Sequence, residues 1–201
     1  MEQDQRRIQR SYRPTKIEKI VREEGERKKL ILRGYPILFN VEATVYDYWV
    51  GEYKEIILPT ALDGVDLSGV YLLRSHDPDK VLGKNGVNMR LEVDETGLFF
   101  ECELLDTQIA RDTYAEVDAG LIDGMSFGCY LSDQINETTM TRTVTHIDEL
   151  VEITITPFPA YKEASVVAKR AAERKVEEQA EAETIAEAEA REKFIKEMEE
   201  W

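Results

Sequence analysis

The sequence is poor in the residues that build several common kinds of site. Its 201 residues include only two cysteines, Cys102 and Cys129, and two histidines, His76 and His146. Because there is no CxxC pair and so few ligands, no structural zinc site is expected, and no metal or other cofactor is predicted. Two cysteines without a disulfide framework are typical of reduced thiols in the cytoplasm.

Long apolar runs are also absent. No stretch of 18 apolar residues occurs, so the sequence predicts neither a membrane-spanning helix nor a membrane partner. The N-terminal stretch MEQDQRRIQRSYRPTK lacks the apolar core of a secretory signal. Both absences favour a cytoplasmic protein.

The net charge of −15 is unevenly distributed. Residues 1–33 hold 11 Lys and Arg against 6 Asp and Glu, residues 34–161 hold 7 against 23, and residues 162–201 hold 8 against 12. The acidic middle argues against a nucleic-acid surface, so no specific nucleic-acid partner is predicted. We interpret the basic N-terminal segment as a solvated extension; an acidic protein or a phosphate backbone are its alternative contacts.

Composition divides the chain into three segments. Residues 1–29 are predicted to be a basic N-terminal extension with a short helix around Ile17–Glu24. Residues 30–168 hold every glycine except Gly25 and nearly all aromatic residues, which predicts one globular domain. Residues 169–201 lack Gly and Pro and are rich in Ala, Glu, Lys and Arg, which predicts a charged helical C-terminal extension, either a partner-binding helix or a flexible tail.

The central segment is predicted to be mainly β with helices, an α+β domain. Strand-like stretches bounded by Gly, Pro or polar turns occur at 29–40, 52–59, 69–76, 87–105 and 140–157. A tight turn at 94–97 divides the fourth stretch into a hairpin. One helix is predicted after Asp106, from the helical spacing of Ala110, Tyr114, Val117 and Leu121. We expect a mostly antiparallel, closed or nearly closed β-barrel.

The run LIDGMSFGCYL spells G-x-S-x-G around Ser126, the signature of the α/β-hydrolase nucleophile elbow. That elbow needs a strand before the serine and a helix after it, whereas here a helical and turn-like stretch precedes it and a strand follows. The elbow is therefore excluded, and these residues alone leave Ser126 as either a nucleophile or a small strand residue. Cys129 lies at an odd offset on the same strand, so we expect it in the core.

A serine nucleophile needs a general base, and the two histidines are the candidates. His76 ends the stretch 69–76, at a position where a side chain can face a cleft, and 77–79 are predicted to turn the chain. His146 lies among alternating residues and fits an exposed strand position. Glu152, in the apolar run LVEITIT, is an unusual carboxylate; a regular strand would place it on one face with Leu150 and Thr154.

Six blocks of the sequence, in order, resemble the prohead proteases of tailed bacteriophages, capsid-maturation serine proteases related in fold to herpesvirus assemblin. The blocks are RGYPILFN, EYKEIILPTAL, SHDPDKVLGK, ETGLFFECELLDTQIARD, GLIDGMSFGC and LVEITITPFPAYKEASV, between Arg33 and Val167. The departures are Thr60, Ser75 and Cys129, where the family usually has Gly, Asn and an aromatic residue. None of them removes a nucleophile or a base.

The resemblance implies an assemblin-like barrel and a catalytic triad. The family's Met-Ser-Phe-Gly and His-Asp blocks imply Ser126 as nucleophile and His76 as general base, and its closing block implies Glu152 as the group that orients the imidazole. His146 is an alternative third member because assemblin uses a second histidine there. Asp148 and Asp77 are weaker alternatives.

The backbone around Gly124, Phe127 and Gly128 is expected to support the oxyanion. Which further group helps is left open by the residues.

The function implied by the resemblance is that of a serine endopeptidase of capsid maturation. Such an enzyme cleaves the scaffolding segment of the major capsid protein, and itself, inside the phage procapsid in the host cytoplasm. Its partners would be the capsid protein and other copies of itself, with a homo-oligomer as an option. The alternative is a catalytically silent assembly or scaffold protein of the same fold that acts through its terminal helices. The presence of both Ser126 and His76 favours the protease.

Overall fold

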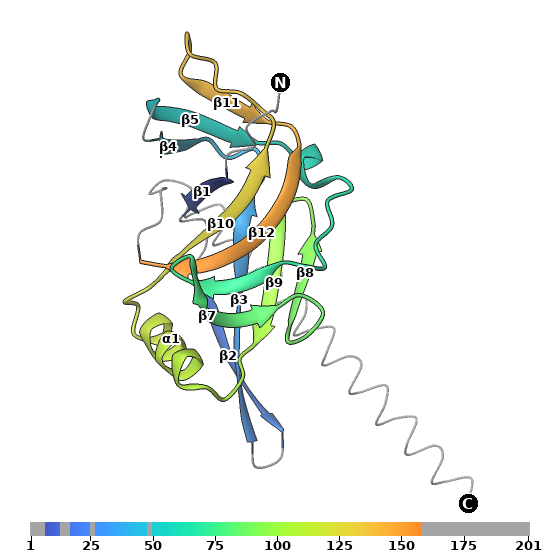
Figure 1. Ribbon diagram of the computed structural model, residues 1–201. Helices are drawn as coiled ribbons and strands as arrows, with labels where there is room; N and C mark the ends of the chain where they lie inside the picture. Colours follow the sequence, from blue (N-terminus) through green and yellow to red (C-terminus); the bar gives the residue numbers. More distant parts are fainter. Residues whose placement is uncertain (1–6, 13–16, 25–26, 48–49, 158–201) are drawn as a thin grey trace, which may run out of the picture.

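The computed structural model describes residues 7–12, 17–24, 27–47 and 50–157 (Figure 1). Its strands form three sheets. The first has the order β1 (Arg7–Tyr12), β10 (Gly124–Leu131), β12 (Ile147–Thr156), β6 (Tyr71–Arg74) and β7 (Asp77–Lys84). The second has the order β2 (Glu18–Glu24), β3 (Arg27–Leu38), β9 (Gly97–Glu103) and β8 (Met89–Val93). The third has the order β11 (Thr141–Val144), β5 (Gly51–Ile57) and β4 (Ala43–Asp47).

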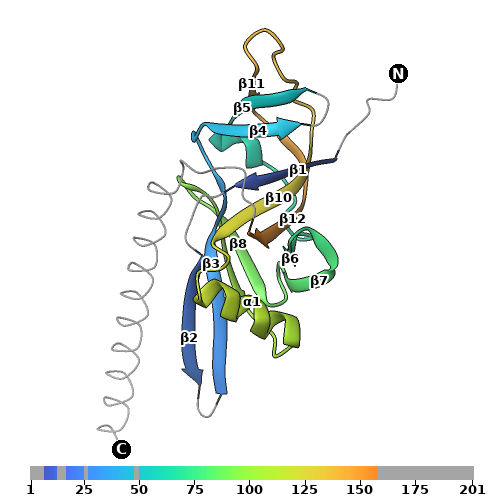
Figure 2. The same cartoon turned by 90° about the vertical axis from the view of Figure 1, so that its left-hand side faces the viewer.

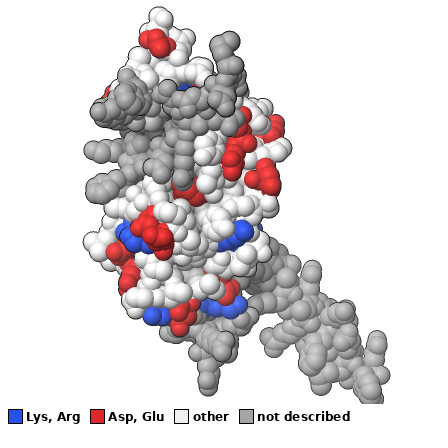
Figure 3. Space-filling view, in the orientation of Figure 1, with Lys and Arg blue, Asp and Glu red and all other residues white. Residues whose placement is uncertain are grey.

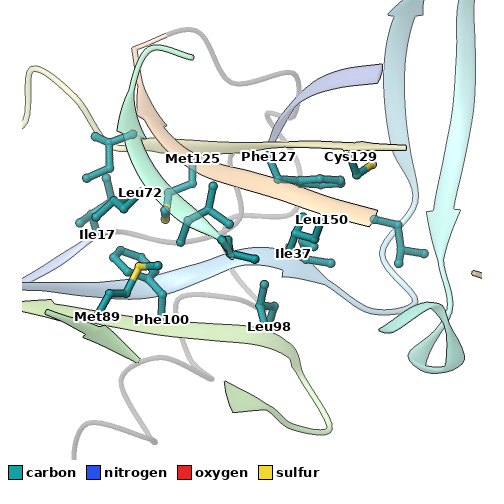
Figure 4. Packing of buried hydrophobic residues seen from close by; sticks show 14 of the residues in the cluster. Ile17, Ile37, Leu72, Met89, Leu98, Phe100, Met125, Phe127, Cys129 and Leu150 are labelled. Carbon is teal, nitrogen blue, oxygen red and sulfur yellow. The ribbon is translucent and has the colours of Figure 1, made fainter. Parts of the chain in front are cut away.

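The core lies where strands of the first sheet pack over strands of the second. Side chains of Met125, Phe127 and Cys129 on β10 meet Leu98 and Phe100 on β9 in one buried cluster (Figure 4). The expectation that Cys129 is a core residue is confirmed, since its side chain is fully buried in that cluster. This packing fixes which face of β10 points away from the core.

The prediction of a mainly β, mostly antiparallel domain is confirmed, but its closure into a barrel is not. Within the described residues, the strands fall into three sheets, and no ladder joins the sheets into a ring. Two pairings, β12 with β6 and β11 with β5, are parallel (Figure 1). The alternation of apolar residues predicts which side chains of a strand are buried, but it does not show which strands pair. The two parallel pairings, which need long connections between the strands, could therefore not be predicted.

The predicted helix around Ile17–Glu24 is also wrong. These residues include strand β2, which pairs antiparallel with β3. A segment this short is a marginal helix on its own, and its β-branched residues suit a strand once β3 supplies a hydrogen-bonding edge. With β1, it brings two strands from residues 1–29 into the sheets.

Local predictions in the middle of the chain are confirmed. β8 and β9 form a hairpin whose turn is held by Asp94, because its Oδ1 accepts hydrogen bonds from the backbone N–H groups of Thr96 and Gly97 at 2.8 and 3.1 Å. The helix α1 (Gln108–Asp118) begins after its N-cap Thr107. Leu121 departs from the prediction, since it lies beyond the helix and is 73% exposed.

A short 3-10 helix, η1 (Pro59–Leu62), completes the described elements. The predicted C-terminal helix at 169–201 lies outside the described residues. In the part of the chain that the structure describes, no helix has the length and apolar character needed to cross a membrane.

Candidate active site

Ser126 is the third residue of strand β10, which follows the turn after α1. Its side chain is fully buried, and its Oγ makes no hydrogen bond to any described residue. A strand, not a helix, carries and follows the serine, so the exclusion of an α/β-hydrolase elbow is confirmed.

The register of β10 and β12 brings the acid onto the face of the serine. Ser126 lies directly opposite Thr154, and Gly128 lies directly opposite Glu152. Residues that face each other across an antiparallel pair share one face of the sheet, as do residues two apart on a strand. Ser126, Glu152 and Thr154 therefore project from the same face, and the neighbouring Phe127 and Ile153 point to the core.

His76 reaches this face from the turn between β6 and β7. Its Nδ1 lies 2.6 Å from Oε1 of Glu152, a hydrogen-bond distance. The histidine side chain is 16% exposed and that of Glu152 is 1% exposed. A glutamate bound at Nδ1 leaves Nε2 as the ring nitrogen that can act as a base.

Thr154 holds the backbone of His76 in place, a function that sequence reasoning missed. Its Oγ1 accepts a hydrogen bond from the His76 backbone N–H at 2.9 Å and donates one to the carbonyl of Leu73 at 3.0 Å. This single hydroxyl therefore hydrogen-bonds to the backbone on both sides of the turn. The available signal was the alternation itself, since Thr154 lies two residues after Glu152 and so on its face.

The turn that presents His76 has an unfavourable backbone. Ser75 and His76 are the two loop residues between Arg74 and Asp77, which pair with each other, and their φ angles are +55° and +59°. Positive φ at both central positions marks a type I′ hairpin turn, which favours Asn and Gly. A non-glycine residue held there is strained, which is common at functional sites. The turn is therefore at 75–76, not at 77–79 as predicted; those residues begin β7.

Gly128 makes room for the carboxylate. A Cβ atom at this position would lie 2.5 Å from Oε1 of Glu152, closer than carbon and oxygen approach each other. Glycine at this point of the G-x-S-x-G run therefore has a steric explanation. Gly124, in contrast, is the first residue of β10.

A bulge in β12 separates the acid from the core. Gly128 pairs with Glu152, but the next residue, Cys129, pairs with Leu150, so Val151 is the extra residue. Leu150 joins the core cluster with Cys129. The expectation that Leu150 shares the face of Glu152 is therefore wrong, because it assumed a regular strand.

The other candidates for the third member lie elsewhere. His146 is exposed just before β12, and its backbone N–H donates to Asp133 at 3.3 Å. Asp148 is exposed and accepts a hydrogen bond from Ser132. The carboxylate of Asp77 is bound by Lys80, which lowers its pKa with the help of the Asp79 backbone N–H.

The segment expected to support the oxyanion lies between two strands. β10 pairs with β12 on one side and with β1 on the other. N–H groups of consecutive residues in a strand point to opposite neighbours, so one of the Phe127 and Gly128 donors faces β12 and the other faces β1. No group of three or more His, Cys, Asp and Glu side chains placed to bind a metal occurs among the described residues.

One face of the described part carries mixed charge. On the face shown in Figure 3, Lys and Arg side chains lie among acidic ones and do not form a basic patch. This agrees with the acidic balance of residues 34–161.

Comparison with known proteins now bears on this geometry. Residues 16–181 match the family model of the caudovirus prohead serine proteases, which is more than half of the chain. The chain belongs to this family. The resemblance expected from six blocks of sequence is confirmed, and it makes the chain a relative of the serine peptidases of tailed-phage capsid maturation.

Solved structures agree at the level of the fold. This prohead protease relative is similar to the bacteriophage T4 capsid assembly protease gp21, with a TM-score of 0.51 and 13% identity. The similarity covers 76% of this chain and 98% of that chain. At so low an identity it indicates a common fold. No curated protein matches the chain.

Proposed function

We propose that this prohead protease relative is a serine endopeptidase in which Ser126 is the nucleophile, His76 the general base and Glu152 the orienting acid. The observation that carries the proposal is the 2.6 Å contact between His76 Nδ1 and Glu152 Oε1 on the face of the sheet that bears Ser126. A base paired with an orienting acid on the face that bears a serine supports acyl-transfer catalysis, and the hydrogen bond from Ser126 Oγ to the base, which is not formed in this structure, has to form when the substrate binds.

The chemistry follows from the two nitrogens of His76. Glu152 accepts the Nδ1 proton and so keeps the Nε2 lone pair available. As Ser126 Oγ attacks the peptide carbonyl, Nε2 takes the hydroxyl proton, and the resulting imidazolium is stabilised by the carboxylate. The imidazolium then protonates the leaving amine, and water hydrolyses the acyl-enzyme by the same steps.

The environment of Glu152 supports a catalytic role over a structural one. Its carboxylate is buried, and Oε2 has no hydrogen-bond partner among the described residues. Burying a carboxyl group with only one of its oxygens hydrogen-bonded is costly, and a core built only for stability avoids it. A cationic imidazole beside the carboxylate lowers the cost of burying Glu152, so the arrangement stabilises the imidazolium that forms during the reaction.

The biological role proposed here is maturation of the procapsid in the host cytoplasm. The substrates are the scaffolding segment of the major capsid protein and the chain itself. We assign the protease domain to residues 30–168, with strands β1 and β2 of the N-terminal segment added to its sheets. Residues 169–201 are proposed to contact capsid or scaffold protein, and unchanged incorporation into procapsids after their deletion would contradict this role.

Self-cleavage tests the proposal directly. The full chain and Ser126→Ala are expressed side by side, and intact mass is followed over hours. Ser132→Ala is the matched control, because Ser132 is an exposed serine bound to Asp148, away from His76. Trimming is expected in the parent and in the control and is absent from Ser126→Ala.

Labelling with a fluorophosphonate provides the second readout. Ser126 is expected to be labelled in the parent and in Ser132→Ala. Intact masses at high concentration together with no labelling would instead support a catalytically silent assembly protein.

A further inference from the structure

Strand β1 lies along the strand that carries the nucleophile. It is antiparallel to β10 over its whole length, from Arg7 opposite Tyr130 to Tyr12 opposite Met125, with Ser11 opposite Ser126 (Figure 2). It is the edge strand of its sheet and pairs with no described strand other than β10. The N-terminal residues thus run past the candidate active site as an added strand.

The structure shows Ser126 closed off. Its side chain has no exposed surface, yet a nucleophile must touch the carbonyl of a peptide. Two strands flank β10. β12 carries Glu152 and Thr154 and has to stay, whereas the three residues of the proposed triad all lie outside β1. Movement of β1 would therefore make that edge of β10 accessible while Ser126, His76 and Glu152 keep their positions.

The edge of β10 suits an extended peptide. Extended peptides commonly bind by adding a strand to a sheet edge, where main-chain hydrogen bonds provide affinity for many sequences. Without β1, β10 would present a row of backbone N–H and C=O groups beside Ser126, including one donor from the Phe127–Gly128 pair. β1 satisfies these groups in the same antiparallel manner that a peptide would.

We propose that the β1-facing edge of β10 is the site for an extended peptide substrate and that residues 7–12 occupy it in the full chain as an intramolecular competitor. This rests on the proposed protease function and adds a regulatory step to it. The peptide binds only after the N-terminal strand leaves the edge.

The test measures access to Ser126. The rate of fluorophosphonate labelling is compared for the full chain, for a chain lacking residues 1–12, and for Gln9→Pro/Arg10→Pro. Since consecutive N–H groups point to opposite sides, the double substitution removes one donor to β10 whichever way the strand faces. Gln3→Pro/Asp4→Pro, outside β1, is the matched control, and Ser126→Ala defines the background.

We expect labelling at least tenfold faster in the truncated chain and in Gln9→Pro/Arg10→Pro, with no change in the control. A synthetic peptide of residues 1–13 should slow labelling of the truncated chain in a saturable manner, and a scrambled peptide should not. Circular dichroism and urea unfolding verify that each variant folds; if the truncated chain does not, the double proline variant decides.

Equal labelling of folded full-length and variant proteins would overturn the competitor role while leaving the protease intact. If no protein is labelled, including the truncated one, the proposed function itself fails.

Discussion

At the scale of single residues, the site depends on a small residue placed where a larger one would not fit. The carboxylate of Glu152 lies against the α-carbon of Gly128, and Ser126 is one of the few polar residues of a strand that is almost wholly buried. The G-x-S-x-G spelling is thus accounted for by sterics around the acid. The physical reason for the G-x-S-x-G spelling therefore differs from the one in a nucleophile elbow.

Gly128→Ala should disable the site without unfolding the protein. The added methyl group displaces the Glu152 carboxylate from His76, and a misplacement of this size costs about 100-fold in kcat/KM. The measurement is peptide hydrolysis or fluorophosphonate labelling, alongside thermal unfolding. Gly69→Ala is the control, because an added Cβ at Gly69 meets no atom within 4 Å. An active Gly128→Ala enzyme would contradict the steric role.

At the scale of elements, the β6–β7 hairpin and strand β12 form one unit. The two-residue turn holds His76 at positive φ, and hydrogen bonds to Thr154 and Glu152 tie that residue to β12. The bulge at Val151 lets β12 place Glu152 on one face and Leu150 in the core. Each irregularity serves the position of one functional side chain.

Thr154→Val and Thr154→Ser should separate positioning from stability. Valine keeps the shape but leaves the His76 N–H and the Leu73 carbonyl without their partner, so kcat should fall at least tenfold with KM little changed. Serine keeps the hydroxyl and loses a buried methyl group, which costs about 1 kcal/mol of unfolding free energy but preserves kcat. Steady-state kinetics and urea unfolding provide the measurements. A kcat that simply follows stability across both variants would argue for a structural role.

At the scale of the whole molecule, a buried thiol and a buried phenol that stay protonated make the free energy of unfolding depend on pH. Burial raises the pKa of the Cys102 thiol from 9.0 to about 12. Burial, with a hydrogen bond to Asp94, also raises the pKa of Tyr35 strongly from its ordinary value of 10.0. Both groups lie on the two central strands of the second sheet, Cys102 on β9 and Tyr35 on β3.

The free energy of unfolding should therefore fall as pH rises above about 9. The unfolded chain releases these protons near the ordinary pKa values while the native state retains them, so the stabilisation is complete below pH 9 and is lost above it. Each group contributes a slope of at most about 1.4 kcal/mol per pH unit. Urea unfolding in reductant between pH 7 and pH 11 measures the slope. Cys102→Ala/Tyr35→Phe should flatten it, and an unchanged slope would refute the assignment.

Much of the local structure was predictable, whereas the candidate triad came from the family resemblance. The Asp94 turn and helix α1 follow from short-range chemistry, because a carboxylate that accepts nearby N–H groups and a helical spacing of apolar residues act over a few positions. The residues alone left Ser126 open and offered two histidines as bases, and the family resemblance implied the roles of Ser126 and His76. The helix expected at 17–24 failed because a partner strand distant in sequence decides its conformation.

The order of residues along the chain supplies the reactive groups: one serine in Gly-Met-Ser-Phe-Gly, two histidines, a carboxylate in an apolar strand, and no metal-binding pattern. Which of these groups come into contact depends on the fold. The pairing of β10 with β12, the bulge at Val151 and the strained turn at His76 select Glu152 as the residue in contact with the imidazole. Register and bulges depend on packing between segments far apart in the chain, and a shift of one residue would turn each side chain to the opposite face.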